Sequence, residues 1–288
     1  MARLGWRLLH MRRYLAPTIH PPRGSLPILL SVPHAGREYD PDLLANAVQG
    51  RHALETLEDP LVDRLCWRAI AAGLGAVIQH VPRAAIDCNR DESEVDPASV
   101  EGISPDAVGP RARFGLGLVP SRTHRHGALW RRPIARAELD RRIDQVHRPY
   151  QAALAEALET LAIRFGKAIL IDCHSMPNRR GQAEIVIGDR HGTSAASWVA
   201  AEAAGIARDL GFKTALNEPY AGGAIIANHG RPAEAKHAVQ LEIDRSLYLK
   251  PDGRTPGAGF DRIAALIESI AVGLGHSLLD RGLRDAAE

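Results

Sequence analysis

Two histidines and one glutamate lie in or just after short apolar runs of the kind that form buried strands. In open α/β sheets, ligands bind beyond the carboxyl ends of the strands. His34 and His174 each follow such a run by two or three residues, and Glu242 lies inside another. A catalytic zinc ion usually takes three protein ligands of this kind and keeps one position open for water. We therefore predict a hydrolytic metal site in which His34, His174 and one acid are the ligands.

Glu242 is the strongest single candidate for proton transfer. It stands in the apolar stretch 238–243 (AVQLEI), and a buried carboxylate is costly unless it is paired or functional. A metal ion lowers the pKa of its bound water, and a separate carboxylate can then move the proton. The alternative is an ion pair with an arginine such as Arg245. Because the sequence has no HExxH spacing, each histidine alone also fits a hydrogen-bonded loop residue.

Further polar residues at the run ends extend the candidate site. They are Arg83, Asp87, Asn89, Arg90, Asp172, Asp189 and Arg245. His229 lies in a loop with Gly230 and Pro232 and is a candidate to line the substrate pocket. The run 122–126, rich in arginine and histidine, fits either a lid over an anionic substrate or a solvated loop, and we favour the loop.

The strands and helices that must position these residues are indicated by short apolar runs that alternate with amphipathic segments. We predict strands over 26–32, 76–81, 168–171, 184–187, 213–216 and 238–243, and helices over 59–72, 138–164, 195–210 and 263–274. In the first helix, Asp59 and Pro60 fit an N-cap followed by proline at the first helical position. The alternation indicates an α/β fold: a single domain over 26–288 whose mixed, mostly parallel central sheet is flanked by helices.

Composition excludes several other classes of protein. Of the 288 residues, 45% are hydrophobic and 24% are charged, which is typical of a globular chain. The net charge of +2 gives no electrostatic case for nucleic acid or an anionic membrane as partner. No apolar run reaches the roughly 18 to 20 residues that span a bilayer. Three cysteines without a CxxC motif argue against a disulfide scaffold and favour a cytoplasmic location.

Two segments lie outside this regular pattern. Residues 1–25 are expected to be a partly ordered leader, because they lack a long apolar stretch and a cleavage site. Residues 91–132 are rich in Pro, Gly and charge and show no periodicity. A segment of that length inside a compact domain is usually functional or mobile.

Six stretches, taken together and in this order, resemble the N-formylglutamate amidohydrolase family. They are 31–36 (SVPHAG), 59–65 (DPLVDRL), 83–90 (RAAIDCNR), 172–176 (DCHSM), 217–223 (NEPYAGG) and 240–248 (QLEIDRSLY). The resemblance covers roughly residues 30 to 250. It departs from the family pattern at Ala35 and Cys88, where the family often has Ser and Leu. Both changes are small and bear only on substrate specificity.

The resemblance implies a zinc-dependent amidohydrolase with a core like that of zinc carboxypeptidases and aspartoacylases. Its implied reaction is hydrolysis of an N-acyl amino acid, first of all N-formyl-L-glutamate to formate and L-glutamate, as a step of histidine degradation. It implies one zinc ion with His34 and His174 as ligands and Glu242 as the base. Asn89 and Arg90 match a pair that grips a substrate carboxylate.

The second metal ligand is not fixed by the resemblance. The carboxypeptidase pattern places a glutamate three residues after the first histidine, where this chain has Arg37. Asp59, which lies in a matching stretch, is the preferred ligand, and Asp63 and Glu38 are the alternatives. Arg245 either pairs with a second substrate carboxylate or anchors Glu242, and we favour the anchor.

Two other functions stay open. One is an amidohydrolase of the same fold that acts on a different N-acyl amino acid. The other is a catalytically inactive protein that binds acidic amino acids, against which the two histidines and Glu242 speak. In each case the expected partner is a small anionic molecule, with no nucleic acid and no membrane.

Overall fold

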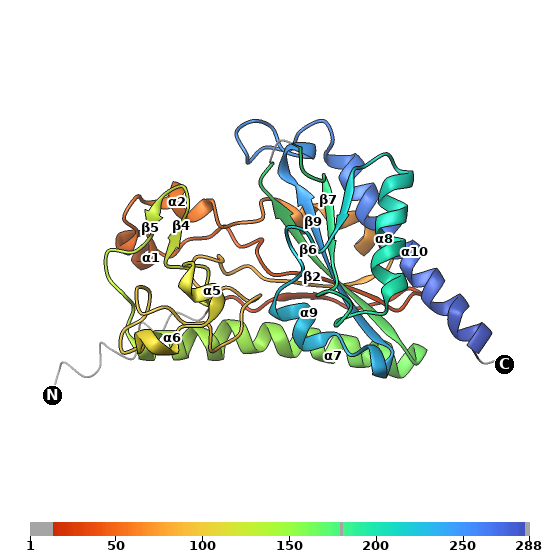
Figure 1. Cartoon of the computed structure of the whole chain (residues 1–288), viewed down its shortest axis with the longest axis horizontal. Coiled ribbons are helices and arrows are strands. Elements are labelled where there is room, and N and C mark those ends of the chain that lie inside the picture. The colour runs from red at the N-terminus through yellow and green to blue at the C-terminus, as the bar shows by residue number, and fades with distance from the viewer. Residues whose placement is uncertain (1–13, 179–180, 286–288) are drawn as a thin grey trace.

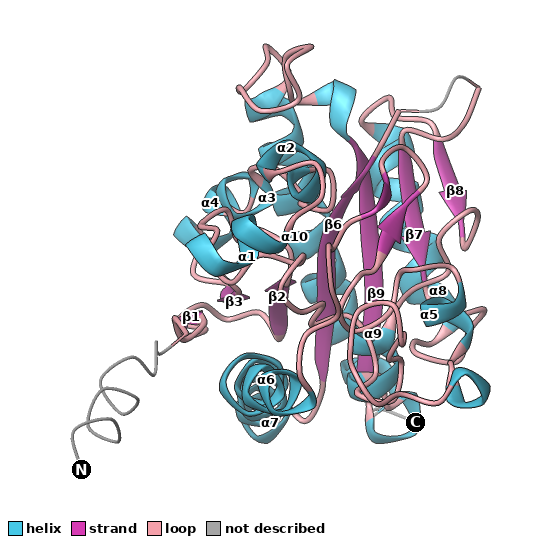
Figure 2. Cartoon of the chain, turned by 90° about the vertical axis from the view of Figure 1, so that its left-hand side faces the viewer, coloured by secondary structure: helices cyan, strands magenta, loops and turns pink. Residues whose placement is uncertain are grey.

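A seven-stranded sheet forms the centre of the computed structural model, which describes residues 14–178 and 181–285. The strand order is β1-β3-β2-β6-β9-β7-β8, and Figure 2 shows it from left to right. The strands are β1 (Thr18–His20), β2 (Ile28–Val32), β3 (Gly75–Ile78), β6 (Ala168–Met176), β7 (Ile185–Gly188), β8 (Thr214–Leu216) and β9 (Lys236–Asp244).

The sheet is mixed and mostly parallel, which confirms the predicted fold class. Strands β3, β2, β6 and β9 run parallel to one another, as do β7 and β8. Antiparallel pairs occur between β1 and β3 and between β9 and β7. The parallel strands β2, β6 and β9 therefore present their carboxyl ends at one edge of the sheet, where ligands bind in folds of this class.

Alternate residues of each central strand enter two separate cores. In β6, Ile169, Ile171 and Cys173 face one core, whereas Leu170 faces the other. The first core is covered by α3 (Val62–Leu65), α4 (Trp67–Ala71), α8 (Ser197–Asp209) and α10 (Phe260–Asp285), and the second mainly by α7 (Arg148–Phe165) and α9 (Ala224–His229). Because side chains alternate along a strand, Asp172 and His174 share the face of Leu170.

The predicted helix over 138–164 is one long helical segment along the base of the molecule (Figure 1). It comprises α6 (Arg136–Arg142), a π-helical turn (Ile143–His147) and α7, and Figure 2 views it end on. Gly166 ends the segment with a φ of 73°, a conformation that glycine adopts without strain.

Two of the predicted elements differ from the structure in ways that affect the site. Strand β6 extends to Met176, so Asp172 and His174 lie within the strand and not after it. The reason is that β9 pairs with all nine residues, whereas the apolar signal stops at Ile171. The predicted helix over 59–72 was wrong at its start: Leu61, with a φ of 62°, precedes α3, and the Asp59 side chain does not cap a helix.

The irregular segments gather beside the carboxyl ends of the strands, to the left of the sheet in Figure 1. They carry α1 (Pro41–Asn46), α2 (Arg51–Glu55), α5 (Pro110–Arg113) and a small hairpin of β4 (Arg122–Thr123) and β5 (Gly127–Ala128). The aperiodic segment 91–132 thus contains short elements. It also contributes Val95, Val100 and Leu118 to the second core.

Residues near both ends of the chain are part of the fold. Of the predicted leader, residues 1–13 lie outside the described residues, and β1 within it pairs with β3 at the sheet edge. Helix α10 contains a stretch, Phe260–Arg281, with the length and mean hydropathy (1.4) of a membrane-spanning helix. Half of its most apolar part is buried within the fold, and it packs against α3, α4, α8 and β2.

Candidate metal centre and active site

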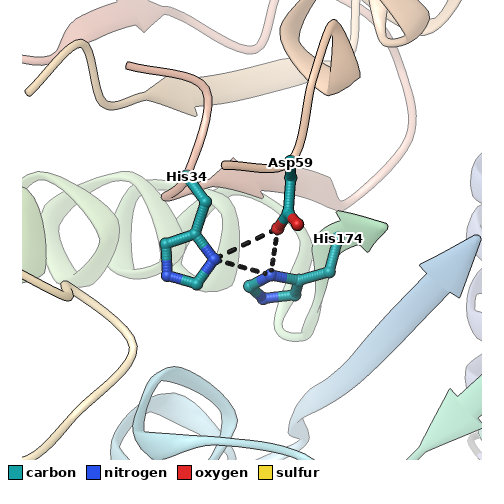
Figure 3. A group of neighbouring side chains, drawn as sticks. All are labelled: His34, Asp59 and His174. Carbon is teal, nitrogen blue, oxygen red and sulfur yellow. Dashed lines mark hydrogen bonds and ion pairs between the residues drawn. The ribbon is translucent and has the colours of Figure 1, made fainter. Parts of the chain in front are cut away.

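Three side chains meet at the carboxyl edge of the sheet and point toward one another (Figure 3). Nδ1 of His34 lies 3.1 Å from Oδ2 of Asp59 and 3.2 Å from Nδ1 of His174, and Nδ1 of His174 lies 2.9 Å from the same oxygen. All three side chains are almost fully buried. Two imidazole nitrogens and one carboxylate oxygen thus form a nearly equilateral triangle.

The chain brings these residues together from separate segments. His34 lies two residues beyond β2, His174 lies within β6, and Asp59 lies in the connection before α3. The parallel register of β2 and β6, in which Ser31 pairs with Asp172, aligns the first two. The amide of Asp59 donates to the carbonyl oxygen of His34 at 3.0 Å, which ties the third ligand to the first.

A carboxylate behind each histidine fixes the orientation of its ring. Nε2 of His34 lies 2.7 Å from Oδ1 of Asp87, and Nε2 of His174 lies 2.7 Å from Oδ2 of Asp172. With the proton on Nε2 as donor to the carboxylate, the Nδ1 lone pair of each ring faces the triangle. Such carboxylate–histidine pairs are the usual support of metal ligands in proteins.

Asp87 and Asp59 are held in their ionised forms. Burial favours the neutral acid, but the guanidinium groups of Arg83 and Arg90 outweigh it and keep the pKa of Asp87 well below its usual range. Burial likewise opposes ionisation of Asp59. The adjacent imidazole groups of His174 and His34 outweigh it and lower the pKa of Asp59 well below its usual value. Both carboxylates therefore carry negative charge toward the triangle.

Arg245 anchors Asp59 and not Glu242, against the expectation from the sequence. Its Nη2 lies 3.1 Å from Oδ1 of Asp59, and its Nε donates to Oγ of Ser175 at 3.0 Å. The reason is position: Arg245 directly follows β9, and its side chain reaches the connection before α3 that carries Asp59. These bonds occupy one oxygen of Asp59 and leave the other to face the histidines.

The donor set fits a zinc ion. Tetrahedral zinc with ligand distances of about 2.0–2.2 Å holds its ligand atoms roughly 3.3 Å apart, and the three separations here are 2.9 to 3.2 Å. The set of two histidines and one carboxylate is a usual one for a catalytic zinc site. The two sequence alternatives are not part of the triangle: Asp63 pairs with Arg37 at 2.6 Å, and Glu38 is exposed.

Glu242 lies beside His174 on the same face of the sheet, because the two residues are register partners in β6 and β9. Burial is the main cause that raises the pKa of Glu242, to about 7, while the charges of His174, Arg83 and Arg245 oppose the increase. Its Oε1 accepts a hydrogen bond from Nε2 of Gln240 at 2.9 Å. A carboxylate with a pKa near 7 suits general acid–base work at neutral pH.

Asn89 and Arg90 stand at the wall of the same site. Oδ1 of Asn89 accepts from the amide of Ile225 at 2.9 Å, and a Cβ on Gly223 would overlap the Asn89 amide. Glycine at 223 is therefore required for this close approach. Arg90 donates from Nε to the Leu116 carbonyl at 2.6 Å and from Nη1 to the Asn89 carbonyl at 2.8 Å.

A cavity of about 720 Å³ opens over this wall. It is lined by Glu242, Asn89, Arg90 and Arg245, all of which the sequence predicted for the site. His229 is not among the lining residues. It ends α9, and its Nε2 lies 2.8 Å from Oε1 of Gln151, which in turn donates to the carbonyl of Cys88. Its position supports the 88–90 segment from behind.

Three residues that the sequence placed at the run ends without a specific role, Asp87, Asp172 and Arg83, lie near the centre. Gln240, which was not a candidate, lies there too. For two of them, the spacing along a strand could have revealed the position: Asp172 lies two residues before His174, and Gln240 lies two residues before Glu242. Such pairs share a face. Arg83 donates to Oδ2 of Asp87 at 2.8 Å and lines the cavity, a contact between loop residues that no periodicity marks.

Comparisons with known proteins agree with this arrangement. A model described as N-formylglutamate amidohydrolase matches residues 26–249. N-formylglutamate deformylase from Pseudomonas aeruginosa is 29% identical over 270 residues, which cover 90% of this chain and 95% of that protein. A protein of the same name from Pseudomonas putida is 29% identical over 238 residues, 79% of this chain and 84% of that protein.

A solved structure extends the likeness to the fold. The crystal structure of N-formylglutamate amidohydrolase from Ralstonia eutropha JMP134 superposes with a TM-score of 0.83 at 33% identity, over 93% of this chain and 100% of that one. The stretch that the family model matches contains His34, Asp59, His174 and Glu242. The chain therefore belongs to the N-formylglutamate amidohydrolase family.

Proposed function

We propose that this chain is a zinc-dependent amidohydrolase that converts N-formyl-L-glutamate and water to formate and L-glutamate. The observation that carries the proposal is the buried triangle of His34, Asp59 and His174 next to Glu242, in a chain of this family. Both relatives from Pseudomonas are named for the same reaction.

The three ligand residues are proposed to hold one zinc ion. When bound there, zinc supplies a Lewis acid that polarises the formyl carbonyl and lowers the pKa of a water molecule. The residues around it keep the geometry fixed: Asp87 and Asp172 orient the rings, and Arg245 holds Asp59.

Glu242 is proposed as the proton carrier. Its carboxylate takes a proton from the attacking water as the water oxygen bonds to the formyl carbon. It then gives that proton to the amide nitrogen as the carbon–nitrogen bond breaks, so that L-glutamate leaves as the amine. Arg83 lines the cavity close enough for its charge to act on Glu242, and we assign it to stabilise the developing oxyanion.

Asn89 and Arg90 are proposed to hold the α-carboxylate of the substrate. Arg90 is fixed by its bonds to the carbonyls of Leu116 and Asn89, and its Nη2 has no hydrogen-bond partner among the described residues, which leaves it for an anion. A charge-assisted contact from a pre-positioned guanidinium gives both affinity and orientation. With this reaction the chain would act in histidine degradation, in the cytoplasm.

The test combines metal analysis with formate release. Protein purified without chelator is assayed with N-formyl-L-glutamate before and after metal removal, together with Glu242→Gln. We expect one equivalent of zinc, turnover that zinc restores, and a Glu242→Gln variant that keeps zinc but loses formate release by roughly 100- to 10,000-fold.

Two results would contradict the proposal. Full activity in the metal-free protein would show that the reaction does not depend on zinc. Bound zinc without formate release would show that N-formyl-L-glutamate is not the substrate. A panel of other N-acyl amino acids would then be tested.

A further inference from the structure

The cavity wall carries more positive than negative charge. Six arginines and three carboxylates line it: Arg83, Arg90, Arg111, Arg125, Arg245 and Arg254 against Glu55, Glu242 and Asp252. A cavity with such a surplus attracts anions and raises their local concentration.

Three of the arginines are neutralised by protein carboxylates. Arg83 pairs with Asp87 at 2.8 Å, Arg245 with Asp59 at 3.1 Å, and Arg254 with Glu55 at 2.6 Å. Arg90 lies 3.8 Å from Asp87, at the limit of an ion pair. These four side chains are therefore held in place largely by the protein.

Arg111 differs from them. Within the described part of the chain, its guanidinium forms no ion pair and no hydrogen bond. Its hydrogen bonds in that part are made by its backbone: the amide donates to Oε2 of Glu94 at 3.0 Å, as does the amide of Ala112, and the carbonyl accepts from the amides of Phe114 and Leu116. Glu94 thus fixes the start of α5 and leaves the positive charge of Arg111 free at the cavity wall.

The backbone places Arg111 next to Arg90. Nε of Arg90 donates to the carbonyl of Leu116 at 2.6 Å, and the amide of Leu116 donates to the carbonyl of Arg111 at 3.1 Å. One residue therefore connects the two. The pKa of Arg90 agrees: burial lowers it most, and the nearby charges of Arg83 and Arg111 lower it further.

Two guanidinium groups on one wall repel each other unless an anion lies between or beside them. The proposed substrate has two carboxylates joined by a short aliphatic chain, and Arg90 is assigned to the α-carboxylate. We infer that Arg111 binds the side-chain carboxylate of the N-acyl amino acid and sets the preference for an acidic substrate, an inference that rests on the proposed function.

Arg125 is the other lining arginine without an ion pair in the described residues, but it fits less well. It lies in the turn between β4 and β5, where its charge acts on His126. His126 in turn packs edge-on against His52, with ring centroids 4.8 Å apart. Among the described residues, no hydrogen bond or ion pair links Arg125 to Arg90 or to a residue that Arg90 binds. The two carboxylates of one glutamate need neighbouring cations, which favours Arg111.

The test compares two substrates that differ only in side-chain charge, N-formyl-L-glutamate and N-formyl-L-glutamine. The zinc-loaded variants are Arg111→Ala, Arg111→Lys and Arg125→Ala. The matched control is Arg113→Ala, which removes an exposed arginine from the same helix; Arg113 does not line the cavity. The measured quantity is kcat/KM for each substrate.

We expect Arg111→Ala to lower kcat/KM for the glutamate substrate by roughly 10- to 100-fold, the size of a charge-assisted contact. The glutamine substrate should change less than about threefold, and Arg111→Lys should recover part of the loss because a positive charge remains. Arg113→Ala should leave the ratio of the two substrates unchanged.

Several results would overturn the inference. They are an equal loss for both substrates in Arg111→Ala, no loss for either, or a loss of discrimination in Arg125→Ala alone. If the wild-type protein releases formate from neither substrate, the proposed function fails separately. Calorimetry with glutarate and its monoamide glutaramate then decides: glutarate binding that weakens only in Arg111→Ala supports the inference, and unchanged or absent glutarate binding overturns it.

Discussion

The buried centre of the site and the exposed rim of the cavity hold their charges in different ways. The centre, called the floor below, consists of His34, Asp59, His174 and Glu242, of which Glu242 lines the cavity. These residues lie on or beside central strands, and each side chain is at most 7% exposed. At the rim, Arg111 and Arg125 lie on a short helix and a hairpin turn and are exposed. Bond-making chemistry needs fixed geometry, whereas selection of an anion needs only charge in the right place.

The support behind each region follows the same division. Each floor ligand has a second partner, namely Asp87, Asp172 or Arg245. The Arg111 guanidinium at the rim has no such partner among the described residues. The difference indicates that substitutions in the floor will act through metal binding and turnover, while those in the rim will act through substrate preference.

Removal of a ligand should have the largest effect. In His174→Ala, the triangle loses one of its three donors, and a zinc site with two protein ligands binds far more weakly. We expect zinc content to fall to background and formate release to fall below detection. Asp63→Asn, four residues after Asp59 but paired with Arg37, should retain full zinc. Loss of zinc in Asp63→Asn would reverse the choice of the second ligand.

Removal of a supporting carboxylate should have a smaller effect on the same quantity. Asp172→Asn takes away the charged acceptor behind His174, and such changes typically weaken metal binding by roughly 10- to 100-fold. Competition with a zinc chelator measures the change. The control is Asp189→Asn, which alters a similarly buried acid at the end of β7. Equal zinc affinity in the two variants would contradict the orienting role of Asp172.

Crowding of Asn89 should affect substrate binding and stability together. A Cβ in Gly223→Ala would press on the Asn89 amide, and overpacking of this kind costs about 1–3 kcal/mol of unfolding free energy. We expect an increase in KM with little change in zinc content. In contrast, Gly205→Ala within α8 meets no close neighbour and should stabilise by about 0.4–1 kcal/mol. Urea unfolding and steady-state kinetics measure both quantities.

His229, which lies behind the cavity wall, should make the free energy of unfolding modestly dependent on pH. Burial lowers its pKa to about 4 from 6.5, so the unfolded chain takes up a proton between these values and the folded chain does not. The free energy of unfolding therefore falls as the pH drops from about 6.5 to 4. His229→Gln should flatten that part of the curve, while His276→Gln, an exposed site on α10, should not. Identical curves for all three proteins would contradict the assignment.

Strand periodicity predicted the fold and much of the floor because both depend on local patterns. The apolar runs ended near His34 and His174, and Glu242 stood out as a charge inside such a run. The same signal ended β6 too early, since Asp172 and His174 are polar although β9 pairs with them. Asp59 came from the family resemblance, and its expected capping role was wrong because its carboxylate faces the two histidines.

The remaining features depend on contacts between distant loops, which leave no periodic signal. Arg245 reaches Asp59 across 186 positions of sequence, and the fit of Asn89 against Gly223 depends on how α9 packs. The place of Arg111 follows from Leu116 and Glu94, in a segment whose only sequence signature was the absence of regular pattern. Tertiary packing, not local propensity, decides these positions.

The most direct test of the central claim is a crystal structure of the zinc-loaded protein with anomalous diffraction data at the zinc edge. The account predicts one strong peak about 2.0–2.2 Å from Nδ1 of His34, Nδ1 of His174 and Oδ2 of Asp59. A peak elsewhere, for example between His52 and His126 at the rim, or no peak at the triangle would contradict it.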